Sequence, residues 1–98
     1  MFGRMTTLEG TPESVDAGVA ALRDQVLPTT KAMDGFKGII AFADRTTGKM
    51  MAVTLWESED AMKASEEGAN TLRALSAEAT SARIAGVDRL EVVLDERM

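Results

Sequence analysis

The 98-residue chain contains no cysteine, no histidine and no tyrosine, and it has a single tryptophan. Without cysteine there is no disulfide framework, no thiolate metal site and no cysteine nucleophile. Without histidine there is no Ser-His triad, no imidazole ligand for zinc or haem, and no side chain whose ordinary pKa lies near neutrality. These absences exclude a large part of enzyme chemistry before any pattern is considered.

Positive charge is also scarce, because 11 Lys and Arg residues stand against 16 Asp and Glu residues, a formal net charge of −5. Binding to a phosphate backbone needs a basic face, so we expect no nucleic-acid partner. The longest uncharged apolar stretches, 38–43 and 50–56, are too short for a bilayer span, and the N-terminus does not resemble a signal peptide. We therefore expect a soluble, cytoplasmic protein with no membrane partner.

The remaining composition is that of a globular protein, with 45% apolar and 28% charged residues. The length corresponds to one domain, and no low-complexity segment or Pro/Gly/Ser-rich linker interrupts the chain. We therefore expect residues 1–98 to form a single domain.

Local signals mark where the regular elements begin and end. Thr11 followed by Pro12 is typical of a helix start, and Pro28 is expected to end that helix. Gly48 can take the positive φ of a hairpin loop over 45–49, and Ser58 is a plausible N-cap for a second helix.

The periodicity of the apolar residues predicts the order β-α-β-β-α-β. Strands are expected over residues 2–9, 37–44, 50–57 and 89–95. Helices are expected from Thr11 to Pro28 and from Ser58 to about Ser81. This order is the ferredoxin-like α+β plan, in which a four-stranded antiparallel sheet carries both helices on one face.

The third strand is apolar on both faces, with Met51, Val53 and Leu55 on one and Met50, Ala52 and Trp56 on the other. Helices can cover only one face of the sheet, and the other would leave a large apolar patch in water. We therefore expect a homodimer that packs sheet against sheet. The alternative is that short strands simply mix their faces.

Few residues are candidates for chemistry. Trp56, at the end of the third strand, either fills the junction between strand and helix or forms a flat wall for a planar ligand. Arg73 either pairs with acidic residues on its own helix surface or anchors a phenolate. The acidic pair Glu66-Glu67 is typical of a solvated helix face.

Three features together resemble the antibiotic biosynthesis monooxygenase (ABM) family: the β-α-β-β-α-β length, the turn 34–36 (Asp-Gly-Phe) and the junction 56–61 (Trp-Glu-Ser-Glu-Asp-Ala). The resemblance covers nearly the whole chain. It implies a dimeric α+β barrel, in which two ferredoxin-like sheets pack face to face.

The resemblance also implies which residues line a ligand site. The quinone-forming branch of the family uses the junction Trp, an Arg on the second helix, an Asn on the third strand and a Tyr early in the second helix. Trp56 and Arg73 match the first two, and Ala52 and Met62 stand at the other two positions. The haem-degrading branch uses a His as its iron ligand, and this chain has none.

The function that the resemblance implies is the oxidation of a small aromatic or polycyclic metabolite by O₂, with no metal or flavin cofactor. Trp56 would stack on the substrate, and the fixed charge of Arg73 would favour the phenolate over the phenol. Two alternatives stay open on the same scaffold: a non-catalytic small-molecule binder and a structural dimer.

Overall fold

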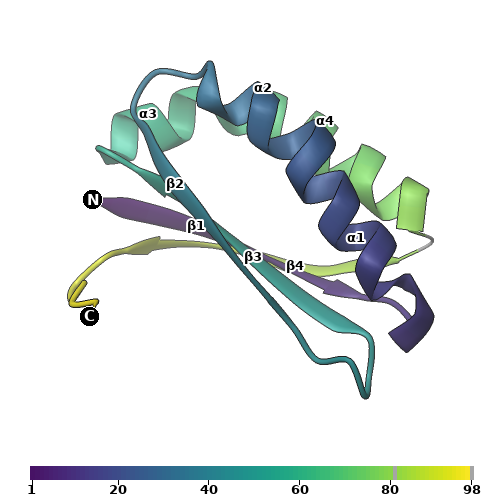
Figure 1. The fold of residues 1–98 in the computed structure, drawn as a ribbon. Helices are drawn as coiled ribbons and strands as arrows, with labels where there is room; N and C mark the ends of the chain where they lie inside the picture. Colours follow the sequence, from purple (N-terminus) through teal and green to yellow (C-terminus); the bar gives the residue numbers. More distant parts are fainter. Residues whose placement is uncertain (81, 98) are drawn as a thin grey trace.

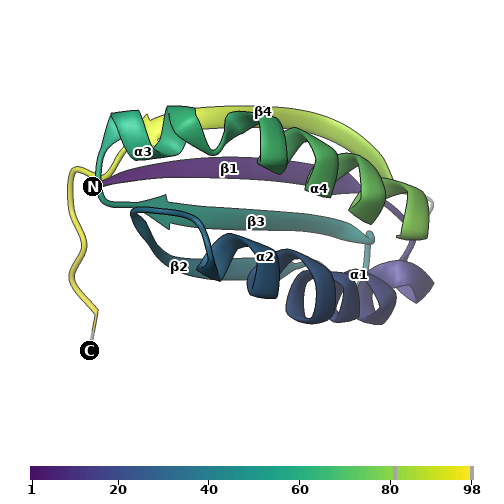
Figure 2. The same cartoon turned by 90° about the horizontal axis from the view of Figure 1, so that it is seen from above.

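The computed structural model describes residues 1–80 and 82–97, and in this part of the chain a four-stranded sheet carries the helices on one face (Figures 1 and 2). The strands are β1 (Phe2–Glu9), β2 (Phe36–Ala43), β3 (Lys49–Trp56) and β4 (Arg83–Glu91). They lie in the order β2-β3-β1-β4, and each neighbouring pair is antiparallel. The predicted ferredoxin-like α+β fold is confirmed.

The helical segments fall into two groups along the chain. Between β1 and β2 lie a 3₁₀ turn η1 (Pro12–Ser14), α1 (Val15–Ala21), a π turn η2 (Leu22–Val26) and α2 (Leu27–Lys31). Between β3 and β4 lie α3 (Glu59–Ala64) and α4 (Glu66–Thr80). Within residues 1–80 and 82–97, no helix is both long and apolar enough to cross a membrane.

The sequence predicted that the first helical group ends at Pro28, but it continues to Lys31. In an α-helix the proline ring clashes with the carbonyl four residues earlier, and proline has no N–H to donate. The chain avoids this conflict with a π turn just before Pro28, where the N–H of Leu27 bonds to the carbonyl of Leu22. The wider turn lets the helix pass the proline.

The second helical group is broken at Ser65, and its predicted end at Ser81 lies outside the described residues. The carbonyl of Met62 accepts hydrogen bonds from the Ser65 hydroxyl at 2.7 Å and from the Arg4 guanidinium at 2.6 Å. In a continuous α-helix that carbonyl would instead accept from the backbone N–H of Glu66. A strand residue therefore helps to set the boundary between α3 and α4.

The last strand lies over Arg83–Glu91 rather than 89–95, so its predicted position was wrong. It pairs with the whole length of β1, and a bulge shifts the register between Thr7 and Leu8. Gly86 and this bulge interrupt the two-residue alternation in the first half of β4, so the apolar pattern of the sequence does not indicate a strand there. The pairing with β1, not the local pattern, decides where β4 begins.

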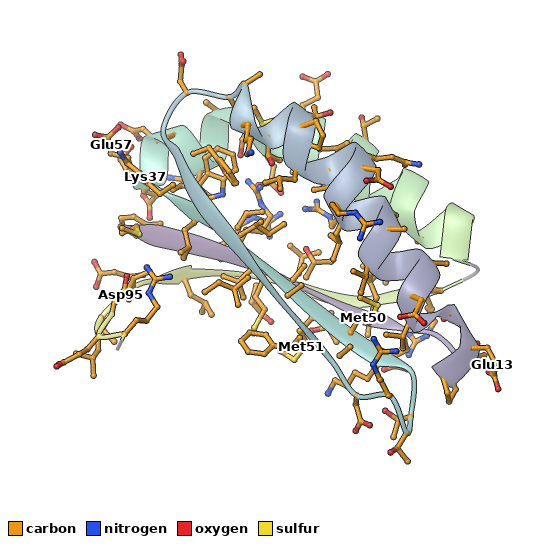
Figure 3. All side chains as sticks on the ribbon, viewed as in Figure 1. Glu13, Lys37, Met50, Met51, Glu57 and Asp95 are labelled. Atoms are coloured by element: carbon orange, nitrogen blue, oxygen red, sulfur yellow. The ribbon has the colours of Figure 1, made fainter. Side chains whose placement is uncertain are left out.

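The sheet register decides which face the helices cover. Met50 and Trp56 of β3 lie under the helices and are 6% and 0% exposed. Val53 lies on the opposite face, where Met5 and Ile40 are its cross-strand partners, and Met51 also points away from the helices (Figure 3). We call this second surface the open face; its exposed side chains include Phe42 and Leu90, at 59% and 51%.

Candidate functional site

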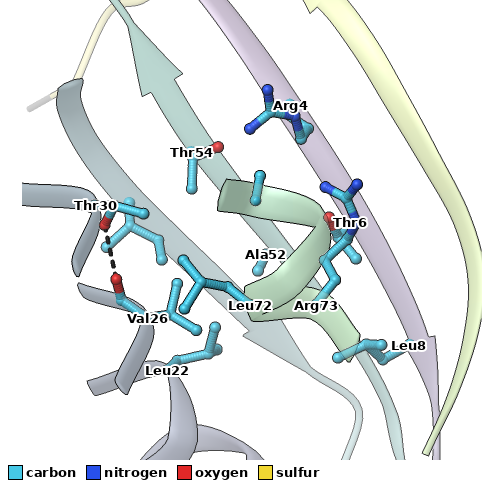
Figure 4. Close-up of a pocket in the computed structure, with 12 residues that line it drawn as sticks. Arg4, Thr6, Leu8, Leu22, Val26, Thr30, Ala52, Thr54, Leu72 and Arg73 are labelled. Carbon is cyan, nitrogen blue, oxygen red and sulfur yellow. Dashed lines mark hydrogen bonds between the residues drawn. The ribbon is translucent and has the colours of Figure 1, made fainter. Parts of the chain in front are cut away.

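A cavity of about 50 Å³ lies between the sheet and the helices (Figure 4). Most of its wall is apolar. Leu8 of β1 and Ala52 of β3 form part of its floor, and Leu22, Val26 and Leu72 approach from the helices. Ligand sites of this kind are concave and apolar, with a few placed polar groups that orient the ligand.

The π turn helps to place the helical part of this wall. Residues that face the sheet recur at four-residue steps through Gly18, Leu22, Val26 and Thr30. A regular α-helix repeats every 3.6 residues, so such a series would drift around the helix away from the sheet. The wider π turn over Leu22–Val26 offsets this drift and keeps both Leu22 and Val26 on the cavity.

Arg4 is the buried charge of the site. Alternation along β1 places it on the helix-covered face with Thr6 and Leu8, and its side chain is 3% exposed. Besides the Met62 carbonyl, its Nη2 donates to the Ser65 hydroxyl at 3.0 Å and to Glu66 Oε2 at 2.8 Å. Its Nε is buried and has no hydrogen-bond partner among the residues that the structure describes.

Glu66 is the carboxylate around which the site's arginines gather. It accepts hydrogen bonds from Arg4 and from Arg89, and an Nη of Arg73 lies 3.6 Å from its Oε1. The hydrogen bond from Arg89 lowers the pKa of Glu66 most. The charge and hydrogen bond of Arg4 lower it further, against the opposing effect of partial burial, so that this pKa falls from 4.5 to about 2. Glu66 is therefore ionised at neutral pH.

Arg73 reaches the cavity from α4 and points toward Arg4 (Figure 4). Its side chain is 12% exposed, and one Nη donates to the side chain of Asn70. The other, Nη1, is buried without a hydrogen-bond partner in the described ranges 1–80 and 82–97. Burial lowers the pKa of Arg73, and the positive charge of Arg4 lowers it further. Two repelling guanidinium groups thus share one side of the cavity.

Trp56 packs against the guanidinium of Arg4. Its side chain is fully buried, its Nε1 donates to Thr54 Oγ1 at 3.0 Å, and the Phe36 ring meets it edge-on with centroids 5.4 Å apart. The guanidinium carbon of Arg4 lies 5.7 Å from the centroid of the Trp56 ring, a cation–π distance. Trp56 touches the site through Arg4 and Thr54, both of which line the cavity.

Of the four residues that the resemblance implies for the ligand site, two line the cavity and two do not. Arg73 and Ala52 line the cavity. Trp56 and Met62 are not among its lining residues, and both are buried beside it, at 0% and 3% exposure. The ligand-binding roles of all four stay predictions.

Sequence reasoning missed Arg4 and assigned Glu66 to a solvated helix face. A signal for Arg4 was available, because it is a lone charge on the strand face that it shares with Thr6 and Leu8. Glu66 gave no such signal, because its acidic neighbour Glu67 makes it look like ordinary helix-start chemistry. Its side chain is only 28% exposed, since the fold brings Arg4 and Arg89 to it from two adjacent strands.

In the described residues, no group of three or more His, Cys, Asp or Glu side chains is arranged to hold a metal ion. The polar chemistry of the cavity is instead cationic. Guanidinium groups in an apolar surrounding can bind an anionic oxygen and stabilise negative charge that develops on a bound molecule.

The sequence model of the antibiotic biosynthesis monooxygenase family matches residues 1–77, and the chain belongs to this family. Two relatives from Mycobacterium tuberculosis are uncharacterized proteins. Rv2557 is 37% identical over 78 residues, and Rv2558 is 40% identical over 73 residues. These matches cover 80% and 74% of this chain but only 35% and 31% of the relatives, so the chain spans about a third of their length.

Solved structures share the whole fold at low sequence identity. A Deinococcus radiodurans protein assigned to the antibiotic biosynthesis monooxygenases has a TM-score of 0.74 and 15% identity, with 100% of this chain and 98% of that chain covered. Rv0793 of Mycobacterium tuberculosis has a TM-score of 0.67 and 22% identity, with 99% and 98% covered. A dimeric ferredoxin-like protein from an uncultured marine organism has a TM-score of 0.72 and 13% identity, with 97% of each chain covered. At these identities the likeness concerns the fold.

Proposed function

We propose that the chain is an ABM-type monooxygenase that oxidises a small phenolic molecule with O₂ and without a metal or flavin. The observation that carries this proposal is the guanidinium of Arg73 on the wall of an apolar cavity, with its Nη1 buried and unpartnered among the described residues. A fixed positive charge in such a place favours a phenolate over the neutral phenol, because it lowers the pKa of a nearby acid. Membership of the ABM family supports the reaction type.

The proposed reaction needs no other reductant than the substrate. The phenolic proton passes to solvent, and the electron-rich ring activates an adjacent CH₂ carbon, which reacts with O₂. One oxygen atom stays on that carbon as C=O, and the other leaves as water with the two hydrogens of the CH₂. The carbon loses four electrons and O₂ gains four. In this scheme the chain supplies binding, orientation and the positive charge that stabilises the anion.

The size of the cavity narrows the substrate class. At about 50 Å³ it is much smaller than the pockets of several hundred Å³ that enclose drug-sized ligands. A single ring enters only if side chains such as Leu22 and Leu72 shift, and a polycyclic molecule needs a larger movement of the helices. The geometry therefore favours a small aromatic substrate over a polycyclic one.

An oxygen electrode tests this function. Purified protein is mixed with a panel of phenols and anthrones that carry an activated CH₂, and O₂ uptake and product are measured together. We expect one O₂ consumed for each C=O formed, at a rate well above that without protein. Arg73→Ala should abolish most of this rate, whereas Arg83→Gln, which removes an exposed charge paired with Glu9, should leave it unchanged. No protein-dependent uptake with any substrate would contradict the proposal.

A second candidate function is a non-catalytic binder or structural dimer on the same scaffold. The observation that favours it is the tight packing around Trp56, whose ring is enclosed by Phe36 and Arg4 and fully buried. Saturable binding without O₂ uptake would identify a binder. Neither binding nor uptake in a folded dimer would identify a structural role.

We further propose that the chain forms a homodimer through the open face. On this face Val53 is flanked by Met5 and Ile40, and Phe42 and Leu90 are more than half exposed. Exposed apolar area of this kind usually marks an interaction surface. The dimeric ferredoxin-like protein with the same fold supports this assembly.

A further inference from the structure

We infer that the cavity recognises its ligand through a carboxylate group, which Arg4 and Arg73 bind together. This inference rests on the proposed function, because it names the ligand class of the same cavity. The inference adds Arg4 of β1 to the residues that bind the ligand, and it adds a carboxylate to the ligand. The proposed binding of a phenolate by Arg73 requires neither.

The first argument is the balance of charge. Arg4 and Arg73 line the cavity, and among the described residues both pair with the carboxylate of Glu66, which also pairs with the exposed Arg89. Positive charge therefore exceeds negative charge in this cluster. The chain as a whole carries a net charge of −5, so this cluster is opposite in sign to the net charge of the chain. Charge that is buried without a partner is unfavourable, and a bound anion would relieve it.

The second argument is the pair of unpartnered donors. Arg4 Nε and Arg73 Nη1 are both buried and lack hydrogen-bond partners within residues 1–80 and 82–97. Their guanidinium groups are neighbours, because Nη2 of Arg4 lies 2.8 Å and that of Arg73 3.6 Å from the oxygens of Glu66. Both residues line the same cavity. Buried N–H groups are normally satisfied, so these two unpartnered donors point to a ligand that accepts from both.

The third argument concerns which anion fits. A carboxylate has two oxygens, one for each donor, and charge-assisted bonds from guanidinium to carboxylate are short and strong. A phosphate or sulfate would need donors for further oxygens, whereas much of the remaining wall is aliphatic, as at Leu22, Val26 and Leu72. These side chains suit a short apolar tail. We therefore expect a small monocarboxylate, alone or as the acidic group of a phenolic ring.

The experiment compares carboxylates with their neutral amides. Acetate, propionate and benzoate are titrated beside acetamide, propionamide and benzamide in buffer without chloride, sulfate or phosphate. Binding is followed by the indole N–H resonance of Trp56, which reports on this cavity because it is the chain's single tryptophan signal and bonds to Thr54 on the wall. We expect at least one acid to bind saturably and at least tenfold more tightly than its amide.

Variants then assign the binding to the two arginines. Arg73→Met should weaken the acid at least tenfold and leave the amide unchanged, and Arg73→Lys should restore part of the loss. Arg83→Gln is the matched control, because it removes an equal charge from an exposed pair with Glu9 and should change nothing. Arg4→Met should act like Arg73→Met, and if this variant does not fold, the two Arg73 variants decide.

The outcomes separate this inference from the proposed function. Acids that bind no better than amides, an Arg73→Met variant that binds the acid normally, or no binding by any probe would overturn the inference. If a carboxylate binds but no substrate causes O₂ uptake, the carboxylate site is supported and the monooxygenase activity is contradicted. If phenols are oxidised and no carboxylate competes with them, the monooxygenase activity is supported and the carboxylate site is contradicted.

Discussion

The guanidinium of Arg4 lies on the ring of Trp56, with 5.7 Å between the guanidinium carbon and the ring centroid. This contact joins Trp56, the first residue of the junction 56–61 that contributes to the family resemblance, to Arg4, which sequence reasoning missed. Trp56 is held in turn by Thr54 and by the edge of Phe36. The tryptophan therefore supports the cationic wall of the cavity from below, whatever ligand the cavity takes.

Shortening Trp56 tests this supporting role. Trp56→Ala removes a fully buried aromatic side chain and should lower the free energy of unfolding by about 3–5 kcal/mol. Trp56→Phe keeps a ring but loses the hydrogen bond to Thr54, and a smaller loss of about 1–3 kcal/mol is expected. Urea denaturation measures both. Val19→Ala, on a side chain that is 37% exposed, is the comparison and should stay within about 1 kcal/mol. Equal stability of wild type and Trp56→Ala would contradict this role.

The depressed pKa of Glu66 predicts how stability depends on pH. Its pKa is about 2 in the folded chain and 4.5 ordinarily, so the ionised carboxylate stabilises the fold above pH 4.5. This contribution is lost as the pH falls through about 2. Because solvent reaches about a quarter of the side chain, we expect it to be about 1–2 kcal/mol.

The measurement is the difference in unfolding free energy between wild type and Glu66→Gln at several pH values. The difference should be largest above pH 4.5 and shrink toward zero near pH 2. Glu59→Gln removes a carboxylate from an exposed pair with Lys63 and should show little difference at any pH. A Glu66→Gln difference that does not change with pH would contradict the assignment.

The parts of the fold that follow from local chemistry were predictable from the sequence. Gly48 takes a φ of 85° in the hairpin loop, and the Ser58 hydroxyl accepts from the N–H of Ala61 at 3.1 Å as an N-cap. Each of these signals is contained in a few neighbouring residues. The order of strands and helices follows from such signals together with the apolar period.

The parts that depend on distant pairing were not predictable. The helix passes Pro28 because a π turn accommodates it, and β4 starts at Arg83 because β1 pairs with it along its whole length. The site shows the same division. Arg73 could be proposed as a site residue from its position on the second helix. Arg4 and Glu66 become part of the site only because β1 packs against α3 and α4, which brings their side chains together.

Two glycines provide a matched test of backbone geometry. Gly35 has a φ of 79°, and a Cβ there would lie 2.5 Å from the Cβ of Ala61, so Gly35→Ala should cost about 1–3 kcal/mol of stability. Gly68 lies inside α4, where a Cβ would meet only the flexible end of Met33 at 2.8 Å. Gly68→Ala should therefore be neutral or stabilise by up to about 1 kcal/mol. Thermal unfolding compares the two, and the reverse order of stabilities would contradict the geometry of both sites.

Charges on the open face test the proposed dimer. Phe42 and Leu90 are 59% and 51% exposed, so Phe42→Glu or Leu90→Glu should leave the core of one chain intact. In a face-to-face dimer, however, each would bury an unpaired carboxylate, which is strongly unfavourable. Light scattering at micromolar concentration should therefore give twice the chain mass of 10.5 kDa for wild type and a shift toward the single mass for these variants.

The control for this experiment is Val19→Glu, which places the same charge on an exposed apolar residue of α1 and should leave the dimer unchanged. Val53→Asp places the charge at the centre of the open face, between Met5 and Ile40, where aggregation or unfolding is expected instead of a stable monomer. A wild-type protein that is monomeric at micromolar concentration would rule out the proposed assembly. A dimer that survives both Phe42→Glu and Leu90→Glu would show that the chains meet through a different surface.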